Sequence, residues 1–125
     1  MISTAKAHTD GQHYALDAKA PGSVSVGGAG DLEIVLLAKD GYHINDEFPY
    51  KLRTAVEPAG AVTFEKPELT RTQGTYTKTE ARFKARFAGA KAGDAKIGGV
   101  LAISVCTAKE CVTDKVQLEV PVTVR

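Results

Sequence analysis

The sequence predicts an all-β protein, an antiparallel β-sandwich of about seven to nine strands. Three observations lead to this prediction. Several stretches alternate apolar and polar residues, as strands with one buried face do. Clusters of Gly and Pro separate these stretches at short intervals. No stretch keeps the i, i+3, i+4, i+7 apolar spacing of an amphipathic helix over three turns.

The predicted strands follow one another along the chain with turn residues between them. Ala81, Phe83, Ala85 and Phe87 alternate with charged residues, and valines and Leu118 alternate with polar residues near the C-terminus. The stretch 31–38 has Leu32, Ile34 and Leu36 on one side and Glu33, Val35 and Leu37 on the other, so we expect a central strand covered on both faces. Gly98-Gly99 is one of the turn signals. The predicted strands are 12–18, 23–26, 31–38, 50–56, 61–65, 80–88, 97–106 and 111–124.

Length and charge narrow the possible functions. The chain of 125 residues fits one domain, expected at 12–125 after a flexible lead-in at 1–11 that lacks the apolar segment of a signal peptide. The 16 Lys and Arg and 15 Asp and Glu are interspersed and give a net charge of +1, which argues against nucleic-acid binding. The longest apolar run, 34–38, is far shorter than the roughly 20 residues of a membrane-spanning helix, so no membrane span is expected.

Two cysteines lie close together in a predicted hairpin. Cys106 ends one β-rich stretch and Cys111 begins the next, with a four-residue connection between them. Directly opposed residues have Cβ atoms about 4.5–5.5 Å apart, so a disulfide can close with little movement. The alternation places both cysteines on the face away from the core. Asp114 falls on the inward side, which suggests a bulge or twist just after Cys111.

The residues alone leave two roles for this pair open. A structural disulfide within one hairpin closes a loop of about six residues and adds only about 2 kcal/mol to the free energy of unfolding in the chain-entropy model. Thiol–disulfide exchange with a partner protein instead requires access to a sulfur. A metal site is disfavoured because few other ligands are near in sequence, and we expect no metal and no cofactor.

Two segments break the alternation. Residues 41–50 concentrate aromatic side chains, His43 and the adjacent acids Asp46 and Glu47, whereas residues 65–79 form a polar stretch expected to be a long loop. His43 beside Tyr42 is a candidate acid–base aid near the sulfurs, although packing at a strand end is the more common role for such a His. The adjacent acids are more simply explained as solvated residues of a turn.

Three parts of the sequence resemble the N-terminal periplasmic domain of the DsbD thiol–disulfide interchange family, also called disulfide bond corrector domains. They are the segment Gly41–Asn45 followed by Pro49, the hairpin Val105–Cys111 and the alternating strand 116–124. The resemblance covers about residues 31–124. The valine and threonine after Cys111 differ from the Pro-Pro that usually stands there in this family.

This resemblance implies an immunoglobulin-like sandwich in the periplasm or another exported location. Cys106 and Cys111 would be the catalytic pair, passing electrons between thioredoxin-like or membrane redox proteins, and a monomer is expected. A cap loop would shield the cysteines, and the segment in the equivalent position here is 69–78. Tyr76 would be the aromatic residue that covers the sulfurs, and Tyr42 and His43 would lie near them. The alternative function is a non-catalytic immunoglobulin-like interaction module of an envelope or secreted protein, in which the disulfide is structural.

Overall fold

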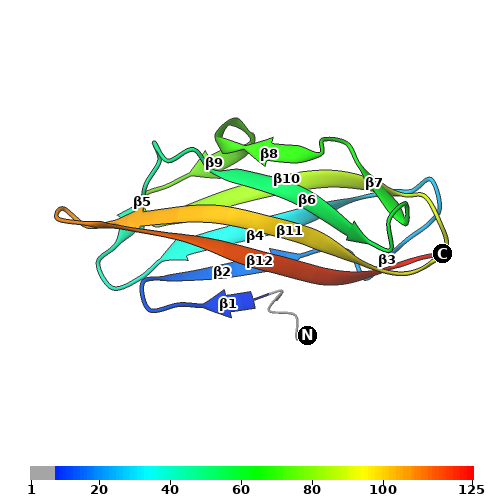
Figure 1. Ribbon diagram of the computed structural model, residues 1–125, viewed down its shortest axis with the longest axis horizontal. Coiled ribbons are helices and arrows are strands. Elements are labelled where there is room, and N and C mark those ends of the chain that lie inside the picture. Colours follow the sequence, from blue (N-terminus) through cyan, green and yellow to red (C-terminus); the bar gives the residue numbers. More distant parts are fainter. Residues whose placement is uncertain (1–7) are drawn as a thin grey trace.

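The computed structural model describes residues 8–125, which form a sandwich of two mostly antiparallel β-sheets (Figure 1). The all-β sandwich predicted from the sequence is thereby confirmed. The front sheet in Figure 1 has the order β3 (Ser23–Val24), β12 (Cys111–Val124), β11 (Gly93–Cys106), β6 (Lys51–Glu57) and β8 (Glu68–Thr70), with β5 (His43–Ile44) also paired to β11. The rear sheet has the order β1 (His8–Asp10), β2 (Tyr14–Lys19), β4 (Ala29–Ala38), β10 (Glu80–Gly89) and β7 (Val62–Phe64), with β9 (Gly74–Tyr76) also paired to β10.

All eight predicted strands are present, and four further strands of two or three residues are added to them: β1, β5, β8 and β9. Strands this short carry too little alternation to be recognised in a sequence. The predicted loop 65–79 contains β8, β9 and a 3₁₀ turn at Arg71–Gln73. Of the predicted lead-in, residues 1–7 lie outside the described part of the chain, and residues 8–10 pair with β2.

The core lies between the two sheets and is built by the alternating positions. Leu32, Ile34 and Leu36 of β4 have no exposed surface, and Phe83 of β10 is also buried. They face the apolar side of β11, which includes Ile103. The expectation that residues 31–38 are covered on both faces is wrong, because Leu37 is 42% exposed on the outer side of β4. β4 is central within its sheet, but its outer face is turned to solvent.

Gly98 and Gly99 do not form the predicted turn; they lie inside β11, the long central strand of the front sheet. Their φ angles are 159° and 143°. A Cβ on Gly98 would lie 2.1 Å from the carbonyl oxygen of Leu118, and one on Gly99 would lie 2.1 Å from that of Arg53. The two glycines therefore allow the flanking strands to approach β11 more closely than any side chain would permit.

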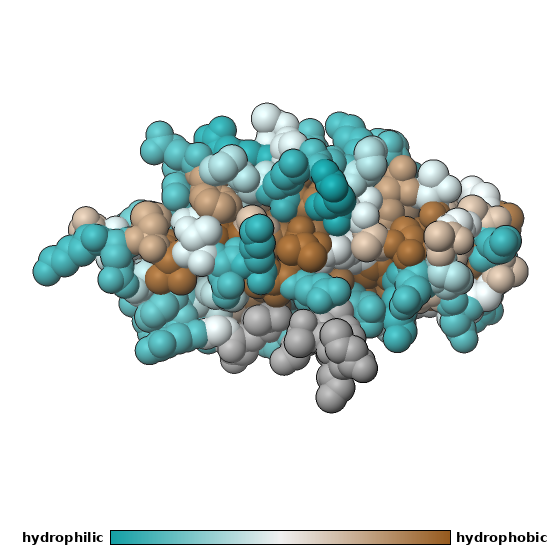
Figure 2. All heavy atoms as spheres, in the orientation of Figure 1, coloured by the Kyte–Doolittle hydropathy of each residue, from teal (hydrophilic) through white to brown (hydrophobic). Residues whose placement is uncertain are grey.

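Side chains on the front sheet's outer surface are mainly hydrophilic, and a broken band of hydrophobic surface runs along its middle (Figure 2). Val100, which follows the two glycines, is 44% exposed. Among residues 8–125, no helix is long and apolar enough to cross a membrane.

Asp114 does not produce a bulge after Cys111, because the register of β12 with β11 is continuous through the pair Ile103↔Asp114. The inward-facing carboxylate instead accepts a hydrogen bond of 2.7 Å from the hydroxyl of Tyr14 in the opposite sheet. This bond satisfies the polar group at the edge of the core. Burial of Tyr14, together with its bond to Asp114, raises the pKa of the phenol from 10.0 to about 12.

This raised pKa predicts a specific loss of stability at alkaline pH. A folded-state pKa above that of the unfolded chain means that the Tyr14 contribution is complete below about pH 10 and is lost as the pH approaches 12. Burial also raises the pKa of Tyr50, so both tyrosines contribute to the wild-type loss. We expect the urea midpoint of Tyr14→Phe to fall less steeply than that of the wild type between about pH 10 and 12. Parallel curves for the two proteins would contradict the assignment.

Candidate functional site

The disulfide lies at the turn end of the β11–β12 hairpin, next to its four-residue connection. The backbone N–H of Thr107 donates to the carbonyl of Glu110 at 2.7 Å, so the next pair inward, Cys106↔Cys111, is of the non-hydrogen-bonded kind. Opposed Cα atoms are closest in such pairs, and here they are 4.0 Å apart. The sulfur atoms are bonded at 2.05 Å. The sequence-based pairing of these two cysteines is therefore confirmed.

The two cysteines differ strongly in exposure. Both lie on the outer face, because the alternate residues Leu101, Ile103 and Val105 point into the core. Cys106 is nevertheless only 6% exposed. Cys106 is covered because β5 lies beside β11 at this point. Cys111 is exposed, and the other neighbour of β12, β3, pairs with it only at Thr123 and Val124. Only one end of the disulfide is thus open to a partner.

His43 lies directly beside the buried cysteine. The register pairs Cys106 with Cys111 on one side and with His43 on the other. Residues directly opposed in a sheet share a face, with Cβ atoms about 4.5–5.5 Å apart. The three side chains therefore form one cross-strand row on the outer face, in the order His43, Cys106, Cys111. In this row His43 is the direct neighbour of Cys106, and Cys111 lies one strand further away.

Ser104 fixes the segment that follows β5. Its carbonyl accepts hydrogen bonds from the Tyr50 hydroxyl at 2.8 Å and from the Asn45 backbone N–H at 3.2 Å. The Asn45 side-chain amide also donates to the Ser104 hydroxyl at 3.3 Å. Tyr50 is 1% exposed and packs its ring on Phe83 of the other sheet. These anchors hold Asp46 and Glu47, between Asn45 and Tyr50, at the side of the disulfide.

Tyr76 and Lys78 approach from the rear sheet. The backbone N–H of Ile44 donates to the carbonyl of Lys78 at 2.8 Å, so β5 joins the two sheets at this end of the sandwich. Tyr76 stacks on Tyr50 with ring centroids 5.8 Å apart, and its hydroxyl donates to the carbonyl of Arg71 at 2.6 Å. Burial raises the pKa of the Tyr76 phenol, while the nearby Arg71 opposes this shift.

Segment 69–78 is in the position expected for a cap loop over the cysteines. It contacts the segment that carries Asp46 and Glu47 through a hydrogen bond from Arg71 Nε to the carbonyl of Asp46. Tyr76 itself forms part of the wall beside the cysteines and packs against the core. The two segments enclose a hollow of about 720 Å³ next to the disulfide. Its lining residues are His43, Ile44, Asn45, Asp46, Glu47, Tyr76, Thr77, Lys78, Cys106 and Cys111. We refer to this hollow as the disulfide cleft.

Tyr42 supports the hairpin from the other face. Its hydroxyl donates a hydrogen bond to the carboxylate of Glu110 in the connection between the cysteines, and this bond raises the pKa of the phenol. The ring of His13 stacks on Tyr42 with centroids 4.3 Å apart. Of the two predicted neighbours, His43 therefore lies beside the sulfurs, whereas Tyr42 positions the loop that connects them.

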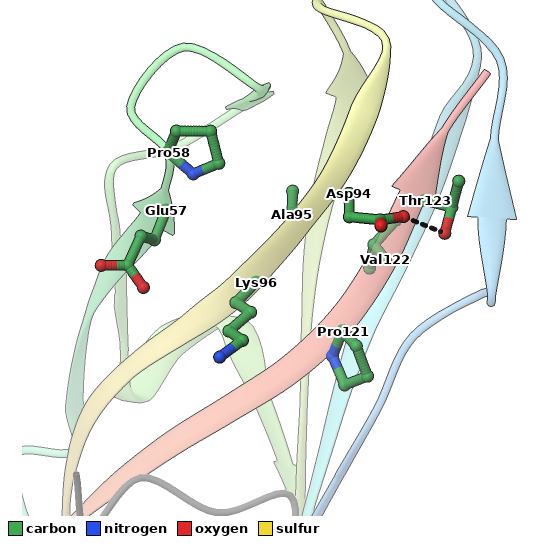
Figure 3. Close-up of a pocket in the computed structure, with 8 residues that line it drawn as sticks. All are labelled: Glu57, Pro58, Asp94, Ala95, Lys96, Pro121, Val122 and Thr123. Carbon is green, nitrogen blue, oxygen red and sulfur yellow. Dashed lines mark hydrogen bonds between the residues drawn. The ribbon is translucent and has the colours of Figure 1, made fainter. Parts of the chain in front are cut away.

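A second hollow lies towards the other end of the front sheet (Figure 3). It is bounded by Glu57, Pro58, Lys96 and Pro121, and Thr123 donates a hydrogen bond of 3.0 Å to Asp94. Lys96 and Cys106 are about 33 Å apart along β11 at the rise of an extended strand. This hollow is therefore separate from the disulfide.

Among residues 8–125, no group of three or more His, Cys, Asp or Glu side chains could hold a metal ion.

Several residues that shape the cleft were not identified as site residues from the sequence. Asn45, Tyr50 and Ser104 read as ordinary turn and strand residues, and their role depends on the two-residue strand β5. Asp46 and Glu47 were interpreted as solvated, and they are exposed but line the cleft.

In comparisons with known proteins, no family model and no curated protein matches this chain.

Proposed function

We propose that the domain exchanges its Cys106–Cys111 disulfide with the thiols of a partner protein. The observation that carries this proposal is the asymmetry of the pair: Cys111 is exposed beside a cleft, and Cys106 is buried. A thiolate can reach Cys111, and Cys106 then leaves inside the protein. The bridge joins neighbouring residues of a hairpin already held by a continuous register, so the fold gains little from it.

The proposed reaction follows ordinary disulfide chemistry. A partner thiolate bonds to Cys111 Sγ, and the bond between the two sulfurs breaks, leaving its electron pair on Cys106 Sγ. The second thiol of the partner then attacks the mixed disulfide and releases Cys111. This chain gains two electrons and two protons, and the partner forms a disulfide. The reverse sequence passes the electrons to an oxidised protein.

The shape of the hairpin supports docking of a protein partner. In Figure 1 the β11–β12 hairpin projects past the neighbouring strands, and its tip residues Ala108, Lys109 and Glu110 are exposed. A partner can contact this tip and the disulfide cleft together. We propose thioredoxin-like or membrane redox proteins as partners and an exported location, such as the periplasm, where disulfides persist. This proposal agrees with the resemblance to DsbD-type domains.

The asymmetry can be tested with single-cysteine variants. Cys106→Ser leaves Cys111 free, and Cys111→Ser leaves Cys106 free. We expect Cys111 in the first variant to form a mixed disulfide with oxidised glutathione at least about tenfold faster than Cys106 in the second, because access to the attacking sulfur limits the rate. Mass spectrometry of acid-quenched samples measures both rates. Equal rates, or a faster reaction at Cys106, would refute the proposed direction of attack.

A further inference from the structure

His43 is the titratable side chain closest in register to the sulfur that leaves. It is half-buried, lines the disulfide cleft and is paired with Cys106 across β5 and β11. Within residues 8–125, its ring has no hydrogen-bond or ion-pair partner. The imidazole is therefore available for a group that appears only when the disulfide opens.

The buried position of Cys106 creates the need for such a group. When the disulfide is opened at Cys111, the electron pair remains on Cys106 Sγ, which is shielded from water. A negative charge is costly at a buried position unless it is paired or neutralised. Of the two neighbours of Cys106 in its cross-strand row, Cys111 is engaged in the mixed disulfide at this stage. His43 is the other neighbour.

We propose that His43 gives a proton to Cys106 Sγ when the disulfide is opened and takes it back when the disulfide re-forms. This role rests on the exchange function proposed above. The imidazolium first stabilises the developing thiolate through its charge and then donates its proton, which completes the thiol of Cys106. In the reverse direction, neutral His43 removes this proton, and the resulting thiolate of Cys106 attacks Cys111 Sγ in the mixed disulfide. The bond between Cys106 and Cys111 re-forms, and the partner leaves as a thiolate.

Other charged groups surround the imidazole. Asp46 and Glu47 line the cleft from the segment after β5, and Lys78 lines it from the segment before β10. The Tyr76 phenol lines the same cleft from β9. Carboxyl, ammonium and phenol groups ordinarily keep their charge between about pH 5.5 and 8, whereas an imidazole changes charge in this range. A dependence on pH in this range therefore reports on a histidine.

The test uses the full oxidised chain and dithiothreitol as the attacking dithiol. The reduction rate is measured from about pH 5.5 to 8 and divided by the concentration of dithiothreitol thiolate, which removes the titration of the reagent. For the wild type we expect this normalised rate to fall about tenfold as pH rises, because the leaving sulfur loses its proton donor. For His43→Gln we expect it to be low and to change less than about twofold.

Two matched variants separate His43 from the other histidines of the described chain. His8 pairs with Asp17 on the rear sheet, and His13 stacks on Tyr42 on the other face of the hairpin. His8→Gln and His13→Gln should both keep the wild-type profile. A flat wild-type profile, a pH-dependent His43→Gln profile, or loss of the pH dependence in His13→Gln would overturn the proposal.

A measurement on the wild type alone avoids any effect of substitution on folding. The ring proton resonances of His43 are titrated by NMR in the oxidised and the reduced protein. We expect the two titration curves of His43 to differ while those of His8 coincide, since His43 is paired in register with Cys106 and His8 lies in the other sheet. Coinciding curves for His43 would overturn the proposal. A disulfide that does not exchange would be revealed by a reduction potential well below about −300 mV. Failure of the exchange function can therefore be distinguished from failure of the proposed role of His43.

Discussion

Gly99→Ala is expected to lose about 3–5 kcal/mol of unfolding free energy, the largest stability effect predicted for this chain. The added Cβ would lie 2.1 Å from the Arg53 carbonyl oxygen, and the φ of 143° is unfavourable for any L side chain. Arg53 belongs to β6, which pairs with β11 at this point, so the clash involves backbone that cannot rotate away. At roughly 4 °C per kcal/mol for a domain of this size, Tm should fall by about 12–20 °C.

Gly22→Ala is the matched control. No heavy atom lies within 4 Å of a Cβ at Gly22, and we expect a change within about 0.5 kcal/mol. Urea unfolding of both variants measures the difference directly. If Gly99→Ala were as stable as Gly22→Ala, the close approach of β6 to β11 at this point would be wrong.

Replacing both cysteines should have the largest effect on activity. The Cys106→Ser/Cys111→Ser protein cannot form a mixed disulfide, so its exchange with dithiothreitol and with oxidised glutathione should be lost completely. Its fold should remain, because the bridge closes a loop of about six residues worth only about 2 kcal/mol. This cost corresponds to a fall in Tm of about 8 °C.

The double variant also distinguishes the two possible roles of the disulfide, exchange with a partner and stabilisation of the fold. Circular dichroism and thermal unfolding of the double variant should show a folded β-protein at 37 °C. The Tyr42–Glu110 bond and the continuous β11–β12 register still hold the hairpin without the disulfide. A double variant that is unfolded at 37 °C would show that the bridge is needed for folding, and it would support the structural alternative.

Much of the fold follows from local sequence patterns. The alternation in β10 and β12 and the Gly and Pro between strands identify the strands that build the core. The pairing of Cys106 with Cys111 was also predictable, because a hairpin with a short connection leaves one simple register. These features depend on residues that are near one another in the chain.

The features that could not be predicted depend on contacts between distant segments. The burial of Cys106 is caused by β5, whose two residues carry no periodic pattern. Asp114 was interpreted as a sign of a bulge because its partner, Tyr14, lies a hundred positions earlier in the other sheet. Gly98 and Gly99 resembled a turn, since sequence alone does not show that two neighbouring strands require the missing side chains. The pairing of the two cysteines was therefore predictable, but their unequal exposure required the tertiary structure.

The reduction potential of the Cys106–Cys111 pair tests the central claim most directly. Equilibration of the protein with glutathione or dithiothreitol buffers, followed by alkylation of free thiols, gives this value. An exchanging pair is predicted to lie between about −120 and −270 mV, the range of known dithiol proteins that exchange with partners. A potential well below about −300 mV is typical of structural disulfides and would contradict the account.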